Sequence, residues 1–513
     1  MNILHFIQFQ EYFELLKDTI ECDKLNMRDV KLKKRKRERM AVTNTHVLKP
    51  RFLICAPSNA AVDNLLERII STGFLQKDGS RYMPDIVRLV GTDAGVSHSA
   101  ESISVERRVQ SLLAMSLNEW NAWYSRQYHT VTSAEAQLKT LLTSNASVED
   151  DCAWVSEVMH IYETRDRALG DLARLERLRS YHLETRSRKV HLACSDLSDE
   201  LCASFVDEAE IVCSTLSSVC KRYVQTASRP FKAIIVDEAC QANEITTLIP
   251  LSTSQSHCVL VGDPKQLPAT VKSRAAQAAK FNRSLFERLM DAGLTSDLLS
   301  IQFRMHPEIA MFPSFKFYRS ALVDAEGLIH SRELPSHSHW PFKPYMIFDA
   351  YNGREERASN LSCYNVTEAR LIIRLLQKYS HYCDSNRNET ANIVILSGYR
   401  EQCLVIEDLL QQSEIPLRTR VSTVDAFQGQ ESDIIILSCV RTSSEDIGFL
   451  ADVRRLNVAL TRARCSMWII CKCDAVAKFD FWSSLLLDAK KRGRYAKDPI
   501  DDIKTHNFSR PLS

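Results

Sequence analysis

Short runs of apolar, β-branched residues recur along this chain, and each is followed by a polar or glycine-bearing turn and then a helical pattern. An uninterrupted apolar run is typical of a strand buried on both faces, as in parallel sheets covered by helices. Alternation of such strands with helices predicts the α/β class. Ligands of these sheets bind at the carboxyl ends of the strands, where the polar residues of the runs fall. The six runs span residues 51–59, 232–239, 257–266, 392–400, 433–441 and 465–473.

Residues 99–210 interrupt this alternation of strand and helix patterns. They contain one glycine, Gly170, and place apolar residues at three- and four-residue steps among mixed charges, as in "RDRALGDLARLERLRSYHL". This spacing predicts amphipathic helices. We interpret the region as an antiparallel helical stalk inserted into the first domain, with a partly disordered linker as the alternative. The predicted domains are 51–305, interrupted by this insertion, and 306–490, between an atypical segment 1–50 and a tail 491–513.

The bulk composition is ordinary for a soluble protein. Of the 513 residues, 25% are charged and 45% hydrophobic, and the net charge of +2 favours neither acidic nor basic partners. No apolar run approaches the roughly 18 residues that a membrane span needs, and the chain does not start like a signal peptide. Sixteen cysteines without a CxxC pair argue against a disulfide scaffold or a zinc finger. The basic tract 31–39 is either a nuclear-import or nucleic-acid patch or a solvated loop.

Two adjacent carboxylates, Asp237 and Glu238, follow the apolar run "AIIV". An aspartate at a strand end can hold Mg²⁺ that is bound to phosphates, while the neighbouring acid polarises the attacking water. Acids also commonly cap the helix that follows a strand, so this pair alone is only moderately specific.

The next predicted strand leads into "LVGDPKQLPATV", residues 260–271. Gly262 permits a tight turn at the strand end. Gln266 offers an amide that can meet a γ-phosphate and a water together. A plain proline-bearing turn is the alternative.

Two arginines in the second half of the chain are candidates for contact with a phosphate. Arg304 stands just before Pro307, a residue that favours the first position of a helix. Arg462 stands beside the apolar run 465–473, which disfavours a simple surface salt bridge. Two arginines closing on a phosphate held by the first domain would act as fingers, and such a charge is worth roughly 10³–10⁵ in rate.

These segments together resemble the superfamily 1B helicases, in the branch of senataxin and the nonsense-transcript regulators. "APSNAAVD", "VDEACQA", "VGDPKQLP", "QFRMHP", "VDAFQGQESD" and "RRLNVALTRAR" resemble motifs Ia, II, III, IV, V and VI of that family, and "WPFKPYMIFDA" and "GFLADVRRLN" favour senataxin. The resemblance covers nearly everything from residue 51 to residue 493. It implies two RecA-like parallel-sheet P-loop NTPase domains, with a helical stalk and a small barrel inserted in the first.

The resemblance also implies a role for each matching residue. Asp237 would coordinate Mg²⁺ and Glu238 would activate the attacking water. The γ-phosphate of ATP would be contacted by Gln266, Arg304 and Arg462. Further nucleotide contacts would come from Gly262, Asp263, Tyr399, Gly429 and Glu431. A nucleic-acid strand would be gripped through its backbone, without reading of its sequence, by Pro57, Ser58, Asn59 and Val62 of the first domain and by Ser422, Val424 and Asp425 of the second.

One element of the family pattern is missing. Superfamily helicases carry a strand–GxxxxGK[ST]–helix element upstream of "APSN", whose backbone N–H groups cradle phosphates. The first glycine of this chain is Gly73, which already follows "APSNAAVD". Either the chain is a fragment, isoform or incomplete gene model of a longer helicase, or it is a non-catalytic relative. Retention of the acids and arginines together favours the first explanation.

We therefore expect an ATP- and Mg²⁺-dependent helicase that moves 5′ to 3′ on RNA or RNA:DNA hybrids, and that is weak or inactive without the missing loop. The alternatives are a non-catalytic scaffold for single-stranded nucleic acid and a DNA helicase of the same superfamily. The expected partners are single-stranded RNA or DNA, RNA:DNA hybrids, and proteins of RNA processing or transcription, with no membrane. We expect a monomer in the nucleus, with the cytoplasm as the alternative.

Overall fold

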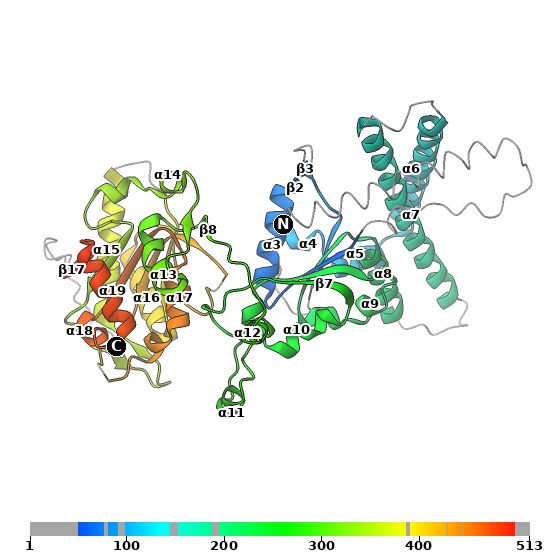
Figure 1. Ribbon diagram of the computed structural model, residues 1–513. Helices are drawn as coiled ribbons and strands as arrows, with labels where there is room; N and C mark the ends of the chain where they lie inside the picture. Colours follow the sequence, from blue (N-terminus) through cyan, green and yellow to red (C-terminus); the bar gives the residue numbers. More distant parts are fainter. Residues whose placement is uncertain are drawn as a thin grey trace, which may run out of the picture. The chain divides into compact units, whose positions relative to one another are not determined.

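The computed structural model describes residues 50–75, 81–90, 98–143, 152–186, 194–385, 390–427, 429–443 and 445–497 (Figure 1). The segment 1–50 apart from its last residue, the basic tract 31–39 and the tail beyond residue 497 lie outside this description. The chain divides into two compact units. Unit 1 comprises Met1–Asp263 and Pro268–Ala292, and unit 2 comprises Pro264–Leu267 and Gly293–Ser513. Each unit is described by itself below.

Unit 1 is built on a five-stranded sheet in which every pairing is parallel, in the order β4-β5-β1-β6-β7. The central strands are almost entirely buried, as continuous apolar runs such as "FLICA" require. The strands are β1 (Phe52–Ala56), β4 (Ile86–Leu89), β5 (Ile211–Thr215), β6 (Phe231–Val236) and β7 (Ser254–Leu260), and a separate antiparallel pair comprises β2 (Phe74–Leu75) and β3 (Arg81–Tyr82).

Helices cover both faces of the unit 1 sheet. Successive residues of a strand point to opposite faces, so Leu53 of β1 joins the core with α5, α7, α8 and α9, whereas Ile54 joins the core with α3. The helices are α3 (Asn59–Thr72), α4 (His98–Glu101), α5 (Val105–Leu113), α6 (Leu117–Thr143), α7 (Cys152–Arg186), α8 (Cys194–Glu208), α9 (Arg222–Gln225), α10 (Glu244–Leu251), α11 (Arg274–Ala278) and α12 (Leu285–Asp291), with 3₁₀ turns η1 (Ser217–Cys220) and η2 (Ala239–Gln241).

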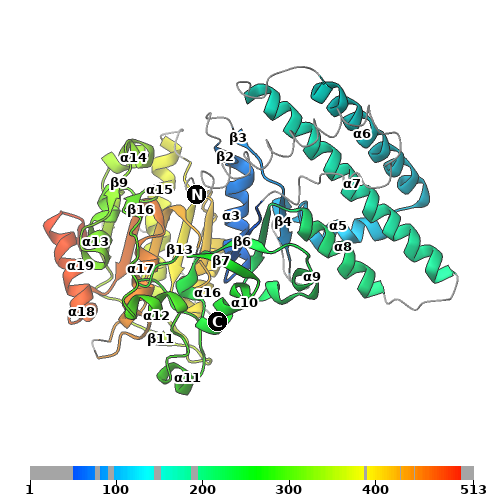
Figure 2. The ribbon, with the colours of Figure 1, turned by 45° about the vertical axis from the view of Figure 1, so that its right-hand side comes forward.

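The long helices α6 and α7 run side by side and extend away from the sheet of unit 1 (Figures 1 and 2). They are antiparallel, because Trp120 near the start of α6 donates its indole N–H to Leu175 O, at 3.1 Å, while Val131 packs against Ala168 and Leu172. Leu175 and Leu178 of α7 also reach the core of the sheet. The two helices are thus fixed to unit 1 at one end of the pair.

Unit 2 contains a six-stranded sheet, also with parallel pairings throughout, in the order β14-β13-β15-β16-β10-β17. Its strands are β10 (Tyr345–Asp349), β13 (Ile393–Ser397), β14 (Thr419–Thr423), β15 (Ser432–Ser438), β16 (Ala463–Cys471) and β17 (Tyr495–Lys497), and the short strands beside it are β8 (Ile301–Gln302), β9 (Val323–Asp324), β11 (Glu356–Arg357) and β12 (Cys363–Tyr364). The apolar residues of β15 and β16 alternate between two cores.

One core of unit 2 packs under α13, α17 and α19, and the other packs under α15 and α16. Sequence signals set where these helices begin. Pro307 starts α13 after an N-cap histidine, and Asp452 caps α17 by accepting from Arg454 N and Arg455 N. The helices are α13 (Pro307–Tyr318), α14 (Leu328–Arg332), α15 (Val366–Ser385), α16 (Arg400–Ser413), α17 (Val453–Leu460), α18 (Cys473–Val476) and α19 (Asp480–Lys491), with 3₁₀ turns η3 (Pro335–Ser338) and η4 (Gly448–Ala451).

The predicted α/β class, with two parallel sheets and long helices between strands of the first, is confirmed. Each of the six apolar runs contains a strand, namely β1, β6, β7, β13, β15 and β16. Within the described ranges, no helix combines the length and the apolar character that crossing a bilayer requires.

Glu368 of α15 is a fully buried carboxyl group in the core region of unit 2. Its Oε2 accepts from the Ser438 hydroxyl at 2.7 Å and from the N–H of Val440 at 2.9 Å. Burial raises the pKa of Glu368 to about 7, although these hydrogen bonds oppose the shift. Below about pH 7, a protonated Glu368 carboxyl is therefore favoured in the folded state.

We expect Glu368 to make the stability of unit 2 depend on pH. Because the folded-state pKa lies above the unfolded value, its contribution is present at pH 4 and is lost as the pH rises through 7. The loss by pH 8 is on the order of 3 kcal/mol. Thermal unfolding of the wild type and Glu368→Gln at pH 5 and pH 8 should show a smaller decrease for the variant. Identical decreases in both proteins would contradict this assignment.

Candidate nucleotide and nucleic-acid sites

The predicted acids lie where β6 ends in unit 1. Asp237 N donates to Cys55 O at 2.8 Å, which continues the ladder with β1, and Glu238 then adopts a left-handed backbone with φ 51° and ψ 37°. A non-glycine residue in this region is strained, and such strain is typical of functional sites. Gly262 at the end of β7 lies against the same turn, because a Cβ there would stand 2.9 Å from Cys240 N. Asp237, Glu238 and Gly262 are thus brought together.

The Asp237 carboxyl fits the predicted Mg²⁺ ligand. Burial raises the pKa of Asp237 above its ordinary value, and the N–H of Glu238 only partly offsets this. In the part of the chain that the structure describes, no lysine, arginine or histidine forms an ion pair with it. A half-buried carboxylate of this kind would be stabilised by a divalent cation, for which carboxylate oxygen is a preferred ligand.

In unit 2 the structure joins Arg304 to Glu431, two predicted site residues far apart in the sequence. Arg304 Nε donates to Glu431 Oε2 at 2.7 Å, and Arg304 Nη1 donates to Thr461 O at 3.2 Å. Both side chains are about two-fifths exposed, so the pair is accessible to a ligand. Gly429 lies two residues before Glu431 with φ 78°, and open space surrounds the position that a Cβ would take.

Unit 2 also joins Gln266 to Arg462. Arg462 Nη2 donates to Gln266 Oε1 at 3.0 Å, and Arg462 is buried directly after the carboxyl end of α17, where the helix dipole favours a cation. Asn457 of α17, a residue that the sequence did not single out, donates from Nδ2 to Lys265 O and Tyr318 Oη, both at 3.0 Å. Asn457 therefore fixes the loop that carries Gln266. Its only signal was its place inside "RRLNVALTRAR".

Tyr399 precedes α16 in a second region of unit 2. Its hydroxyl accepts from Phe449 N at 3.3 Å, and the two rings pack with centroids 6.4 Å apart. Burial raises the pKa of Tyr399, while the Phe449 N–H and Arg441 oppose the shift. Gly398 is required here, since a Cβ would lie 2.3 Å from the Phe449 ring. Among the described residues, the contacts of Tyr399 are with this cluster and not with Arg304 or Arg462.

The residues predicted to grip nucleic acid in unit 1 form the start of α3. Ser58 is the N-cap and its hydroxyl accepts from Ala61 N at 3.2 Å. Pro57, Ser58 and Asn59 are partly or fully exposed. Val62 is buried in the core beneath α3, so only its backbone could meet a strand.

Of the corresponding residues of unit 2, Ser422 lies near the end of β14, and Val424 and Asp425 follow that strand directly. Ser422 donates from its hydroxyl to Thr423 O at 3.3 Å, and Asp425 is exposed but ion-paired with Arg455 at 3.2 Å. That pairing offsets a negative charge that would otherwise repel phosphate. Val424 is buried in the core, as Val62 is in unit 1.

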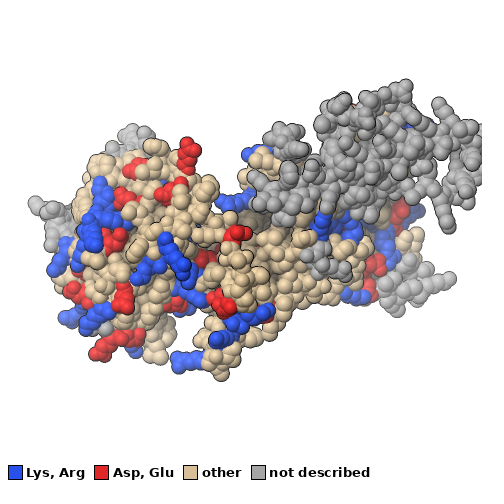
Figure 3. Space-filling model, viewed as in Figure 1, with Lys and Arg blue, Asp and Glu red and all other residues tan. Residues whose placement is uncertain are grey.

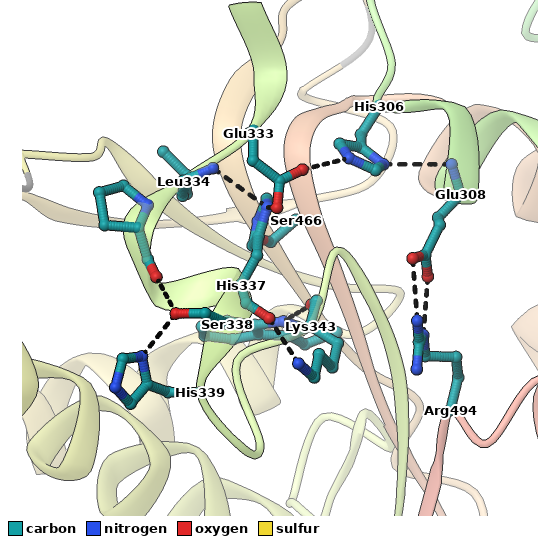
Figure 4. A network of polar contacts seen from close by, with 12 residues as sticks. His306, Glu308, Glu333, Leu334, His337, Ser338, His339, Lys343, Ser466 and Arg494 are labelled. Atoms are coloured by element: carbon teal, nitrogen blue, oxygen red, sulfur yellow. Dashed lines mark hydrogen bonds and ion pairs between the residues drawn. The ribbon is translucent and has the colours of Figure 1, made fainter. Parts of the chain in front are cut away.

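His306, Glu333 and His337 of unit 2 form the one group among the described residues whose side chains could together hold a metal ion (Figure 4). Each imidazole, however, already accepts a backbone N–H at Nδ1, from Glu308 for His306 and from Leu334 for His337, both at 3.1 Å. A neutral imidazole then carries its proton on Nε2, and His306 donates it to Glu333 at 2.9 Å. Metal binding would break both backbone contacts, so we interpret the group as a hydrogen-bonded network.

This network supports the segment that carries Arg304. Arg332 donates to Arg304 O at 2.8 Å and to Phe303 O at 3.0 Å. His306 caps α13 directly after that segment. The backbone on both sides of the Arg304 side chain is therefore held from α14 and the residues that follow it.

Charge is distributed without a single basic stripe on the face of unit 2 that Figure 3 shows, where Lys and Arg are interspersed with Asp and Glu. This agrees with the small net charge. A strand bound here would meet individual side chains and backbone N–H groups more than a continuous positive surface.

Comparison with known proteins identifies relatives over most of the chain. Two family models, each described as an AAA domain, match residues 14–274 and 281–474. Helicase sen1 of Schizosaccharomyces pombe is 34% identical over 470 residues, which are 88% of this chain and 27% of that protein. Helicase SEN1 of Saccharomyces cerevisiae is 34% identical over 88% of this chain and 20% of its own length. Probable helicase senataxin of Homo sapiens is 31% identical over 89% and 17%. The chain thus spans about a quarter or less of these relatives.

Proposed function

Because the chain belongs to the superfamily 1B helicases of the senataxin and NAM7 type, we propose that it couples ATP hydrolysis to movement along nucleic acid. The observation that carries the proposal is the gathering of Gln266, Arg462, Arg304 and Glu431 into two bonded pairs in one unit. A protein that only binds nucleic acid does not need the buried Arg462 beside the Gln266 amide, nor the partly exposed Arg304 beside the Glu431 carboxylate.

Each residue has a distinct part in the proposed reaction. Glu238 accepts a proton from the attacking water, and Gln266 orients that water through its amide. Arg462 and Arg304 present fixed guanidinium groups to the charge that develops on the transferred phosphoryl group. Asp237 would hold Mg²⁺, which when bound neutralises phosphate charge. Tyr399, Gly262, Asp263, Gly429 and Glu431 would complete the nucleotide contacts.

The proposed polymer is single-stranded RNA or an RNA:DNA hybrid, translocated 5′ to 3′ by alternating grips of the two units. The first turn of α3, together with the end of β14 and the residues directly after it, would hold the phosphate backbone. The proposed setting is nuclear RNA processing or transcription, with the chain acting as a monomer. A DNA helicase is the alternative within the same enzyme class, and stronger competition by DNA than by RNA oligonucleotides would favour it.

The second candidate is a scaffold that binds single strands without turnover, a function that needs no GxxxxGK[ST] element. The two candidates differ in their response to nucleotide. A helicase is expected to change its affinity for a strand when Mg²⁺ and a non-hydrolysable ATP analogue are added, because domain closure links the two sites. The scaffold is expected to bind equally with and without nucleotide.

We predict that the chain binds a fluorescent single-stranded oligonucleotide with an affinity that falls about tenfold or more between about 50 and 200 mM salt. The physical reason is release of counterions when protein groups replace them at phosphates. Fluorescence anisotropy across a salt series, with RNA, DNA and hybrid competitors, measures this. Absence of binding at the lowest salt would overturn both candidate functions.

A further inference from the structure

Arg88 of β4 is a fully buried arginine that is hydrogen-bonded to side chains in the first turns of α3. Its Nε donates to Asp63 Oδ1 at 3.0 Å, and its Nη2 donates to Asn59 Oδ1 at 2.9 Å. Its Nη1 donates to Leu89 O. The three nitrogens of the planar guanidinium therefore meet three different acceptors at once.

The contact with Asn59 decides which end of that amide faces the protein. An asparagine amide has one accepting oxygen and one donating nitrogen, and its hydrogen-bond partners fix which is which. Because Oδ1 accepts from Arg88, the donating Nδ2 is the end of the amide directed away from the guanidinium. Asn59 is partly exposed, next to the exposed Ser58. The arrangement thus favours a hydrogen-bond donor on the outer surface of the first turn of α3.

The ion pair between Arg88 and Asp63 already joins β4 to α3. The buried carboxylate already balances the charge of the guanidinium. The additional bond to Asn59 does not add to charge balance, since an amide is neutral, but it does orient a side chain at a surface. A phosphate oxygen accepts hydrogen bonds and never donates them when ionised, so it requires a donor at this place.

We propose that Arg88 is a positioning residue for nucleic acid: it orients Asn59 so that Nδ2 donates to a phosphate oxygen of the bound strand. The inference rests on the proposed function, because it assumes that the first turn of α3 holds a strand. It adds a residue outside that turn whose removal changes binding through Asn59 alone.

The test is a double-mutant cycle on single-stranded RNA affinity, measured by anisotropy in the full chain at fixed salt. Asn59→Ala and Arg88→Lys are each expected to weaken binding about tenfold, as loss of one charge-assisted hydrogen bond does. In the Asn59→Ala background, Arg88→Lys should cause no further loss. Asn64→Ala, the same residue type at an exposed position of the same helix, is the control and should bind as the wild type does.

A stability series separates positioning from simple loss of structure. Arg51→Lys changes another buried arginine of unit 1, ion-paired with Asp207, and is expected to lower the melting temperature without changing affinity. Arg88→Met with Asp63→Leu replaces the buried ion pair by apolar side chains, which often restores stability. This double variant should recover the melting temperature of the wild type and keep the tenfold loss of affinity.

Asn59→Asp gives an independent check. The carboxylate would still accept from Arg88 but would present a second oxygen to the phosphate, so it should bind more weakly than Asn59→Ala. Additive losses in the cycle, or recovery of affinity by the paired Met and Leu variant, would overturn the role of Arg88 and leave the proposed function standing. Failure of the wild type to bind any strand would instead refute the proposed function.

Discussion

A version of this chain in which residues 1–49 are replaced by a strand–GxxxxGK[ST]–helix segment is expected to hydrolyse ATP at least about a hundredfold faster than the unaltered chain. The reason is that these 513 residues contain no such element, and their first glycine is Gly73. The element supplies backbone N–H groups and a lysine to the phosphates, and loss of even one preorganised donor costs about 10²–10³ in rate. The measurement is phosphate release with saturating single-stranded RNA.

The matched control carries the same segment with its P-loop lysine changed to alanine. It should fold as the active version does and remain as slow as the unaltered chain. Equal rates in all three proteins would mean that Glu238, Gln266, Arg304 and Arg462 do not form a working site. The non-catalytic scaffold would then be the better description of this chain.

In the same supplemented chain, Arg462→Ala is expected to lower kcat about a thousandfold or more, since an arginine finger is worth roughly 10³–10⁵ in rate. Arg462 is buried and bonded to Gln266 at 3.0 Å, so its guanidinium is held in one place before the nucleotide arrives. A fixed cation acts mainly on the transition state, and the affinity for ATP should therefore change far less than kcat.

Two further variants complete this experiment. Arg462→Lys keeps the positive charge but loses the planar, multiply donating guanidinium. Its kcat should lie between those of the Arg462→Ala variant and the wild type. Arg494→Ala removes another arginine of unit 2, which is ion-paired with Glu308 at 2.7 Å, and should leave kcat unchanged. If the Arg462 and Arg494 variants lose equal activity, the effect comes from the stability of unit 2 and not from a finger.

Strands could be predicted where apolar residues were continuous, as in "IIIL" of β15 and "MWII" of β16. The fully buried strands β5 and β10 also lie outside the six predicted runs, whereas two other missed strands, β4 and β14, have physical reasons for escaping prediction. β4 is only four residues long, "IVRL", and the charged Arg88 interrupts its apolar pattern. β14 lies at the edge of its sheet and is only partly buried, so its residues are mixed in polarity. Burial of a charge depends on a partner that the strand itself does not reveal.

The candidate site shows a similar division. Asp237, Arg304 and Arg462 could be named from local sequence and from the family resemblance. The pairing of Arg304 with Glu431 could not, because 127 residues separate them and each is one of many charged residues. Asn457 and Arg88 act through neighbours that only the folded chain provides. Sequence therefore predicted candidate site residues, while the hydrogen-bond partners that hold their side chains required the tertiary structure.

The hydrogen bond between Gln266 and Arg462 means that the Arg462 guanidinium already has an acceptor within the protein before ATP binds. Under the proposed function, an incoming γ-phosphate competes with that amide for Nη2 of Arg462, and this competition lowers the ground-state affinity for ATP. After ATP is cleaved, the Gln266 amide can form its hydrogen bond with Arg462 again as inorganic phosphate leaves. The same hydrogen bond that weakens ATP binding would therefore speed the release of phosphate. It would in this way reduce inhibition of the enzyme by its own product.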